Sequence, residues 1–178
     1  MRIVVSGTHA SGKSTLIADL RLRHPEFEVL SDPFELLDEA SDSPSAAMFA
    51  AQLRLSADRL IVETASDLIA ERGPLDFLAY LLAWAELSGG ELDEQVRDHA
   101  TALIVAAMRT VDVLVVLPLT TRDAIPVSDD EHLALRETTN DVLLELIDDP
   151  DLIAGHLLVR EITGTPAGRV TAVEAFLR

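Results

Sequence analysis

The chain has 178 residues and carries 31 acidic against 14 basic residues, a formal net charge of −17. Its 48% of apolar residues can bury a core, which excludes a disordered chain, and the lack of cysteine excludes disulfides and cysteine zinc sites. The acidic balance argues against a nucleic-acid partner. Because no apolar run approaches the roughly 20 residues of a membrane helix, and the apolar N-terminal run is too short for a signal peptide, a cytoplasmic protein without a membrane partner is expected.

Apolar runs rich in β-branched residues alternate with segments of helical spacing along the whole chain. Strands are expected at 2–6, 27–30, 67–70, 111–117 and 156–162. Helices are expected at 14–23, 34–40, 46–64, 75–87, 92–110, 131–147 and 167–177, with an irregular polar stretch at 120–130. Such alternation is typical of a parallel sheet with helices on both faces. Without a repeat or a linker, residues 1–178 are predicted to form one domain.

A complete phosphate-loop pattern, G-x4-G-K-S, follows the first predicted strand and leads into the first predicted helix. Its glycines let successive backbone N–H groups turn toward phosphate oxygens, and the helix start adds its positive dipole end. In such a loop the lysine reaches the β- and γ-phosphates and the serine hydroxyl binds Mg²⁺. The residues expected to hold the nucleotide are Gly7, Thr8, His9, Ala10, Ser11, Gly12, Lys13, Ser14 and Thr15, with Ser14 as the metal ligand.

Lysine usage supports this interpretation. Lys13 is the only lysine among the 14 basic residues, and all others are arginine. The two side chains are not equivalent, because lysine is a compact point charge and arginine a planar fork. An acidic chain must also supply the positive potential for a polyphosphate locally. A single lysine at this position therefore indicates phosphate chemistry.

Three further stretches match one family. They are Ser31-Asp32-Pro33 after the second strand, Gln52 on the long helix, and Glu71-Arg72-Gly73-Pro74-Leu75-Asp76 after the third strand. Together with the loop, they make the chain resemble the P-loop small-molecule kinases, in particular nicotinamide-riboside-kinase-like domains and deoxynucleoside kinases. The resemblance implies a three-layer α/β P-loop NTPase fold with a five-stranded parallel sheet of order 2-3-1-4-5. It also implies ATP and Mg²⁺ as cofactors, and phosphoryl transfer to a hydroxyl of a small acceptor, a nucleoside or related metabolite.

The same resemblance implies site residues. Glu71 is expected to orient or deprotonate the acceptor hydroxyl, and Arg72 to stabilise the transferring phosphoryl group. Asp32 and Gln52 are expected on the acceptor side, with Gln52 where these kinases read the base. Tyr80, with Phe77 and Trp84 on the same helix face, forms either a stacking surface for a base or part of the core.

The segment 120–130 corresponds to the lid of these kinases. Family lids usually carry arginines that clamp the transferring phosphoryl group. This one contains a single arginine, Arg122, which is taken as the lid arginine, and Arg136 on the next helix is the alternative.

Other P-loop proteins remain to be considered. A switch GTPase needs a second lysine in its guanine-binding motif, and this chain has none. A regulatory ATPase or a non-catalytic ATP-binding module stays open, because both share the loop. The sequence leaves the oligomeric state open as well, with a homodimer among the alternatives.

Overall fold

The computed structural model describes residues 1–36, 44–120, 125, 132–153 and 155–177. Five strands form one sheet, in which every neighbouring pair is parallel and the order is β2-β3-β1-β4-β5. The strands are β1 (Arg2–Ser6), β2 (Glu28–Leu30), β3 (Leu68–Glu71), β4 (Val113–Val116) and β5 (Leu158–Glu161). The predicted fold class and strand order are thereby confirmed.

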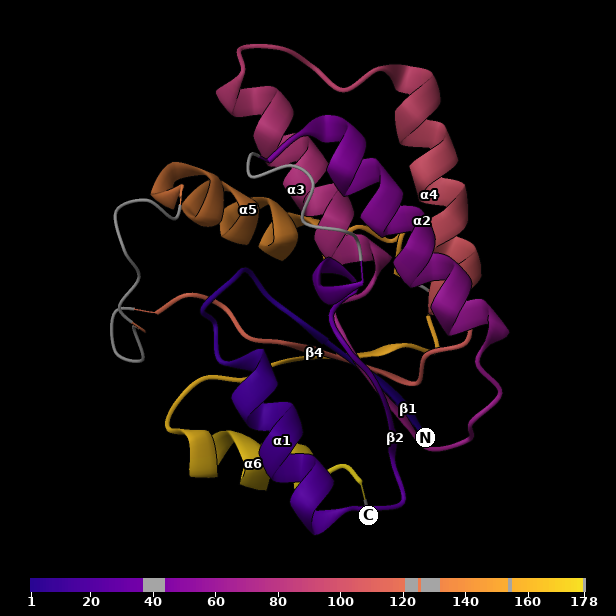
Figure 1. The fold of residues 1–178 in the computed structure, drawn as a ribbon, viewed down its shortest axis with the longest axis vertical. Helices are drawn as coiled ribbons and strands as arrows, with labels where there is room; N and C mark the ends of the chain where they lie inside the picture. The colour runs from indigo at the N-terminus through magenta and orange to yellow at the C-terminus, as the bar shows by residue number, and fades with distance from the viewer. Residues whose placement is uncertain (37–43, 121–124, 126–131, 154, 178) are drawn as a thin grey trace.

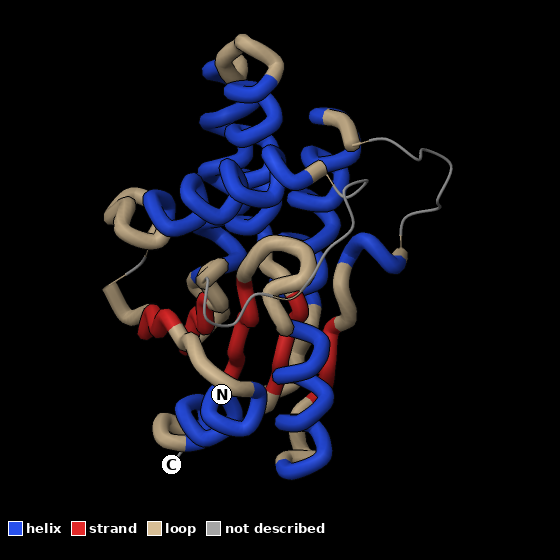
Figure 2. Tube along the Cα trace, turned by 90° about the vertical axis from the view of Figure 1, so that its left-hand side faces the viewer, coloured by secondary structure: helices blue, strands red, loops and turns tan. Residues whose placement is uncertain are grey.

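Helices cover both faces of this sheet (Figure 1). They are α1 (Lys13–Arg23), α2 (Ala46–Val62), α3 (Pro74–Leu87), α4 (Glu94–Met108), α5 (Leu133–Leu146) and α6 (Pro166–Glu174). Helices α1 and α6 lie below the sheet in Figure 1 and the other four above it, and the view in Figure 2 shows the same three layers. No helix in the described ranges is long and apolar enough to span a membrane.

Two apolar clusters fill the spaces between these layers because residues of each buried strand alternate between the two faces. Val4 and Leu114 face the larger cluster, which includes the buried sides of α2, α3 and α4. Ile3, Val5 and Val115 face the smaller cluster, which includes α1 and α6. The sheet is thus buried on both faces, as its continuous apolar strands predict.

The strand register determines which residues meet at the carboxyl edge of the sheet. Val5 is paired with Glu71 of β3, and Ser6 with Val116 of β4. The loop that follows β1 therefore emerges in the middle of the sheet, directly beside the end of β3. Ligands of open α/β sheets bind at this edge, beyond the carboxyl ends of the strands.

Of the helix expected at 34–40, the structure describes only residues 34–36, and these are not α-helical. The structure has a single 3₁₀ turn, η1 (Pro33–Glu35), in which Asp32 accepts a hydrogen bond from the Phe34 N–H at 3.1 Å. Residues 37–43 lie outside the described residues. Of the predicted lid, only Thr120 and Ile125 are described, so Arg122 lies outside them as well.

Candidate active site

The phosphate loop connects β1 to α1 at the carboxyl edge of the sheet. Its two glycines have positive φ angles, 146° at Gly7 and 92° at Gly12. A Cβ atom at Gly7 would lie 2.7 Å from Ser11 Oγ and 2.8 Å from the Leu117 carbonyl oxygen, so a side chain does not fit there. At Gly12 it would lie 2.7 Å from a guanidinium nitrogen of Arg169. Both positions therefore favour glycine for conformation, and at Gly7 the backbone carbonyl also leaves no space for a side chain.

Lys13 lies folded against this loop. Its ammonium group donates to the Thr8 carbonyl oxygen at 2.7 Å, and the side chain is buried. Burial, reinforced by the nearby Arg72 charge, lowers the pKa of Lys13 to about 7. A lysine buried in this way gains an energetically favourable partner when an anion enters the loop.

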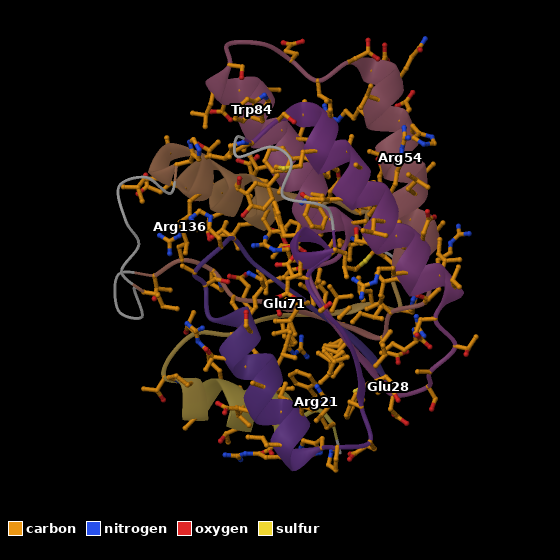
Figure 3. All side chains as sticks on the ribbon, in the orientation of Figure 1. Arg21, Glu28, Arg54, Glu71, Trp84 and Arg136 are labelled. Carbon is orange, nitrogen blue, oxygen red and sulfur yellow. The ribbon has the colours of Figure 1, made fainter. Side chains whose placement is uncertain are left out.

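Ser14 contacts the predicted catalytic carboxylate. Its hydroxyl, on the first turn of α1, donates at 2.7 Å to Oε1 of Glu71, which is labelled in Figure 3. Glu71 is the last residue of β3, not the first residue after it. Two hard oxygen donors held side by side are the kind of ligand that Mg²⁺ prefers.

Arg72 and Asp32 form an ion pair beside the phosphate loop. Arg72 Nε and Asp32 Oδ2 are 2.7 Å apart, and the arginine is 4% exposed. The Arg72 guanidinium also donates to the Gly7 carbonyl oxygen at 3.1 Å and lies 5.2 Å from the ring centre of Phe34. Its backbone is left-handed, with φ of 64°, a strained conformation that occurs preferentially at functional sites.

The charge state of Arg72 follows from these neighbours. Burial alone would lower the pKa of Arg72, but the Tyr80 phenol and the Asp32 and Asp76 carboxylates outweigh it and raise this pKa above its usual value. The guanidinium is therefore a permanent cation between the phosphate loop and the space beside it.

An apolar cavity of about 440 Å³ opens beside this ion pair. Six of the residues around it are His9, Asp32, Phe34, Phe49, Arg72 and Tyr80. The rings of Phe49 and Tyr80 are stacked, with centres 5.0 Å apart. The Tyr80 hydroxyl accepts from the His9 N–H at 3.2 Å, so the cavity wall is attached directly to the phosphate loop.

The aromatic face on α3 belongs to the core and, at Tyr80, also to the cavity wall. Phe77 and Tyr80 are both buried in the larger core cluster, and Tyr80, which is 4% exposed, also lines the cavity. Gln52 is also buried, and its side-chain oxygen has no hydrogen-bond partner among the described residues. It lies one turn after Phe49 on α2. A buried amide oxygen without a partner is costly, and a bound ligand is one way to satisfy it.

Asp76 is a buried site residue to which the sequence analysis assigned no role. Its carboxylate accepts from the Ser6 hydroxyl at 2.6 Å, the Gly7 N–H at 2.8 Å and the Gly73 N–H at 2.9 Å. It therefore fixes the start of the phosphate loop to the start of α3. Burial raises the pKa of Asp76, and Arg72 and the three donors oppose that rise.

Two arginines from distant helices also contact the loop. Arg136 of α5 donates to the carbonyl oxygens of His9 and Ala10, and Arg169 of α6 donates to that of Ser11. Sequence analysis treated Arg136 as an alternative lid arginine and missed Arg169. Thr8 is buried in the loop, and Thr15 is exposed at the start of α1.

Comparison with solved structures identifies proteins that have a similar fold. A deoxyadenosine kinase from M. mycoides, with products dCMP and a flexible dCDP bound, matches with a TM-score of 0.70 and 16% identity over 99% of this chain and 98% of its own. A thymidylate kinase from Candida albicans matches with a TM-score of 0.67 and 17% identity over 98% of this chain and 89% of its own. No protein-family model matches the sequence, and no curated protein does. The chain has the fold of the P-loop nucleoside and nucleotide kinases, as the sequence resemblance predicts.

Proposed function

We propose that this protein is an ATP-dependent phosphotransferase that phosphorylates a hydroxyl of a small acceptor, a nucleoside or a related metabolite. The observation that carries the proposal is the cavity of about 440 Å³ attached to the phosphate loop through Tyr80 and His9. Its size and its aromatic walls suit a nucleoside-sized ligand. An enzyme that only hydrolyses ATP needs space for one water molecule beside the loop, and has no use for such a cavity.

Ser14 and Glu71 would hold Mg²⁺. The serine hydroxyl and the glutamate carboxylate lie 2.7 Å apart beside the loop, and both are oxygen donors. Mg²⁺ bound with the nucleotide would neutralise charge that develops on the β- and γ-phosphates. Lys13 would turn to the phosphates from its two present partners, the Thr8 carbonyl oxygen at 2.7 Å and the Ser11 hydroxyl at 3.5 Å.

Two carboxylates are available to receive the acceptor proton, and their neighbours differ. Glu71 contacts Ser14 on the metal side, whereas Asp32 lines the cavity beside Arg72. We therefore assign the acceptor hydroxyl to Asp32 and the metal to Glu71, in place of the acceptor role that the sequence resemblance implies for Glu71. The acceptor hydroxyl oxygen then bonds to the γ-phosphorus while the bond between that phosphorus and the β,γ-bridging oxygen breaks. The proton of the acceptor hydroxyl passes to Asp32, and ADP leaves. Arg72 is placed to offset the charge of the transferring group.

Recognition of the acceptor would depend on the aromatic wall of the cavity. Phe49 and Tyr80 offer a stacked aromatic wall, and a planar base can pack against such a wall. Gln52 does not line the cavity, but its buried side-chain oxygen has no partner among the described residues, and it would supply a polar contact if its side chain turned toward a bound base. A base with an amino group would satisfy that oxygen.

The test measures ADP formation from Mg·ATP with nucleosides, nucleoside monophosphates and sugars added one at a time. A kinase forms ADP only when the right acceptor is present and yields one phosphorylated product per ADP, which mass spectrometry identifies. ADP formation that is independent of every acceptor would instead establish a regulatory ATPase. Binding of ATP without any turnover would establish a non-catalytic module.

Paired variants then test the two carboxylates. Asp32→Asn should reduce transfer by roughly 10²–10⁴-fold, the usual contribution of general base catalysis, and leave the dissociation constant of ATP nearly unchanged. Glu71→Gln should instead raise the Mg²⁺ concentration required for activity and weaken Mg·ATP binding together. The opposite pattern would exchange the two assignments.

A further inference from the structure

Two arginines hold the outer side of the phosphate loop through consecutive carbonyl groups. Arg136 Nε lies 3.1 Å from the His9 carbonyl oxygen, and its Nη2 lies 3.2 Å from that of Ala10. Arg169 Nη1 lies 2.6 Å from the Ser11 carbonyl oxygen. Figure 3 shows Arg136 on α5 beside the loop, above the start of α1. Three successive carbonyl oxygens, here called the outer carbonyls, are thus bound by guanidinium groups from two helices.

Peptide geometry connects the outer carbonyls to the phosphate side of the loop. A peptide unit is planar and trans, so the carbonyl of one residue and the N–H of the next point in opposite directions and move together. The outer carbonyls of His9, Ala10 and Ser11 belong to the same peptide units as the N–H groups of Ala10, Ser11 and Gly12. An arginine that fixes one of these carbonyls therefore also fixes the direction of an N–H group in the phosphate loop.

The loop conformation requires such support. Ala10 has a φ angle of 50°, which is strained for a residue with a side chain. The two carbonyls that Arg136 binds belong to the His9–Ala10 and Ala10–Ser11 peptide units, which flank Ala10, so they restrain Ala10 from both ends. Strained residues persist only where the surrounding structure over-determines them.

Each contact is also charge-assisted. A carbonyl oxygen that accepts from a guanidinium is polarised, which strengthens the hydrogen bond that the N–H of the same peptide unit donates. Arg169 is 6% exposed and also donates to the Gly164 carbonyl oxygen at 2.9 Å, which joins the loop to the turn before α6. In a chain with a net charge of −17, this places positive charge behind the one loop that must attract an anion.

We propose that Arg136 and Arg169 are positioning residues that hold the phosphate loop in its anion-binding conformation. They act through the peptide units between residues 9 and 12 and not by contact with the nucleotide. The part of this inference that concerns nucleotide affinity rests on the proposed function, because that function makes a polyphosphate the ligand of the loop. The part that concerns loop order is independent of any ligand.

The ligand-free test uses ¹⁵N relaxation of the backbone amides. Arg136→Gln should lower the order parameters of residues 10–12, because the outer carbonyls lose a donor that bound two of them. Arg21→Gln is the matched control, since it removes the same charge from an exposed position of α1 (Figure 3). Unchanged order at residues 10–12 in Arg136→Gln would overturn the proposal, whatever the protein binds.

The binding test uses calorimetric titration with ADP and with adenosine. Arg136→Gln and Arg169→Gln should each weaken ADP by about tenfold, the usual effect of losing a charged hydrogen bond, and leave adenosine unchanged. Arg136→Lys keeps the charge, but a lysine cannot bridge two carbonyls, so the ADP affinity of this variant should remain weakened. Full recovery in Arg136→Lys, or a lower unfolding temperature with unchanged ADP affinity, would refute the positioning role. Failure of the parent protein to bind ADP would refute the proposed function instead.

Discussion

Replacing Asp76 by asparagine should destabilise the protein, because no orientation of an amide satisfies the donors around this position. The Asp76 carboxylate accepts from the Gly7 N–H with one oxygen, and from the Gly73 N–H and the Ser6 hydroxyl with the other. Asparagine retains one oxygen and presents an NH₂ group at the other place. Whichever way the amide turns, either Gly7 or Gly73 faces a donor and loses its acceptor in a buried environment.

The size of this effect follows from the number of donors left unsatisfied. One buried N–H without an acceptor costs about 1–3 kcal/mol. Burial raises the pKa of Asp76, which means that the ionised carboxylate itself carries a desolvation cost that asparagine removes. The expected loss is therefore at the lower end, about 1–2 kcal/mol. Asp76→Ala leaves all three donors without this acceptor and should cost at least about twice as much.

Urea unfolding measures this loss directly. With an m-value of about 2 kcal/mol per molar, the midpoint of Asp76→Asn should fall by about 0.5–1 M. Asp98→Asn, the same exchange at an exposed position of α4, is the control and should leave the midpoint unchanged. Equal midpoints for the two variants would refute the argument that Asp76 connects the phosphate loop to α3.

Further predictions concern charge. Lys13→Ala should abolish phosphoryl transfer and weaken ADP binding without lowering the urea midpoint, because the lysine is buried at a desolvation cost. Burial holds the pKa of Lys13 near 7, below its ordinary value of 10.5, so the folded state binds fewer protons than the unfolded state between these values. The free energy of unfolding contributed by this group should therefore increase as the pH rises from 7 to 10, and urea midpoints of the parent should show an increase that Lys13→Ala lacks. Nucleotide affinity should decrease over the same range, because the phosphates require the protonated amine, and titration calorimetry at pH 7 and 9 measures this decrease. The protein should also fail to bind DNA or RNA in filter-binding assays at about 0.1 M salt, and a micromolar complex would contradict the sequence argument.

Local sequence patterns were sufficient to predict the sheet and the proximity of the phosphate loop to the end of β3. The phosphate loop could be placed directly after the first strand, because the G-x4-G-K-S pattern is continuous in the chain. Order 2-3-1 places β3 beside β1, and this predicts that the carboxylate at the end of β3 lies near the loop. The Ser14–Glu71 hydrogen bond of 2.7 Å confirms that proximity.

The remaining site residues depend on how distant helices pack. Arg169 is 158 positions away from Ser11, and Arg136 is 127 positions away from His9. Nothing near either arginine in the sequence marks it, because its role is set by where α5 and α6 lie on the sheet. Asp76 did carry a signal, since an acidic residue three positions after the start of a helix often accepts backbone N–H groups there. That signal predicts a helix cap, and only the fold adds the Gly7 N–H to the same carboxylate.

The unusual lysine and arginine usage has a physical basis in this packing. Among the residues that the structure describes, five arginines donate to backbone carbonyl oxygens far away in the sequence, namely Arg2, Arg59, Arg72, Arg136 and Arg169. A planar fork with several fixed donors suits this task, because one side chain can bind two carbonyls or connect a carbonyl to a carboxylate. A phosphate loop has the opposite requirement, a compact charge that turns from one oxygen to another as the ligand enters. Lys13, which now contacts the Thr8 carbonyl oxygen, meets this requirement. At this position a point charge serves better than a planar fork.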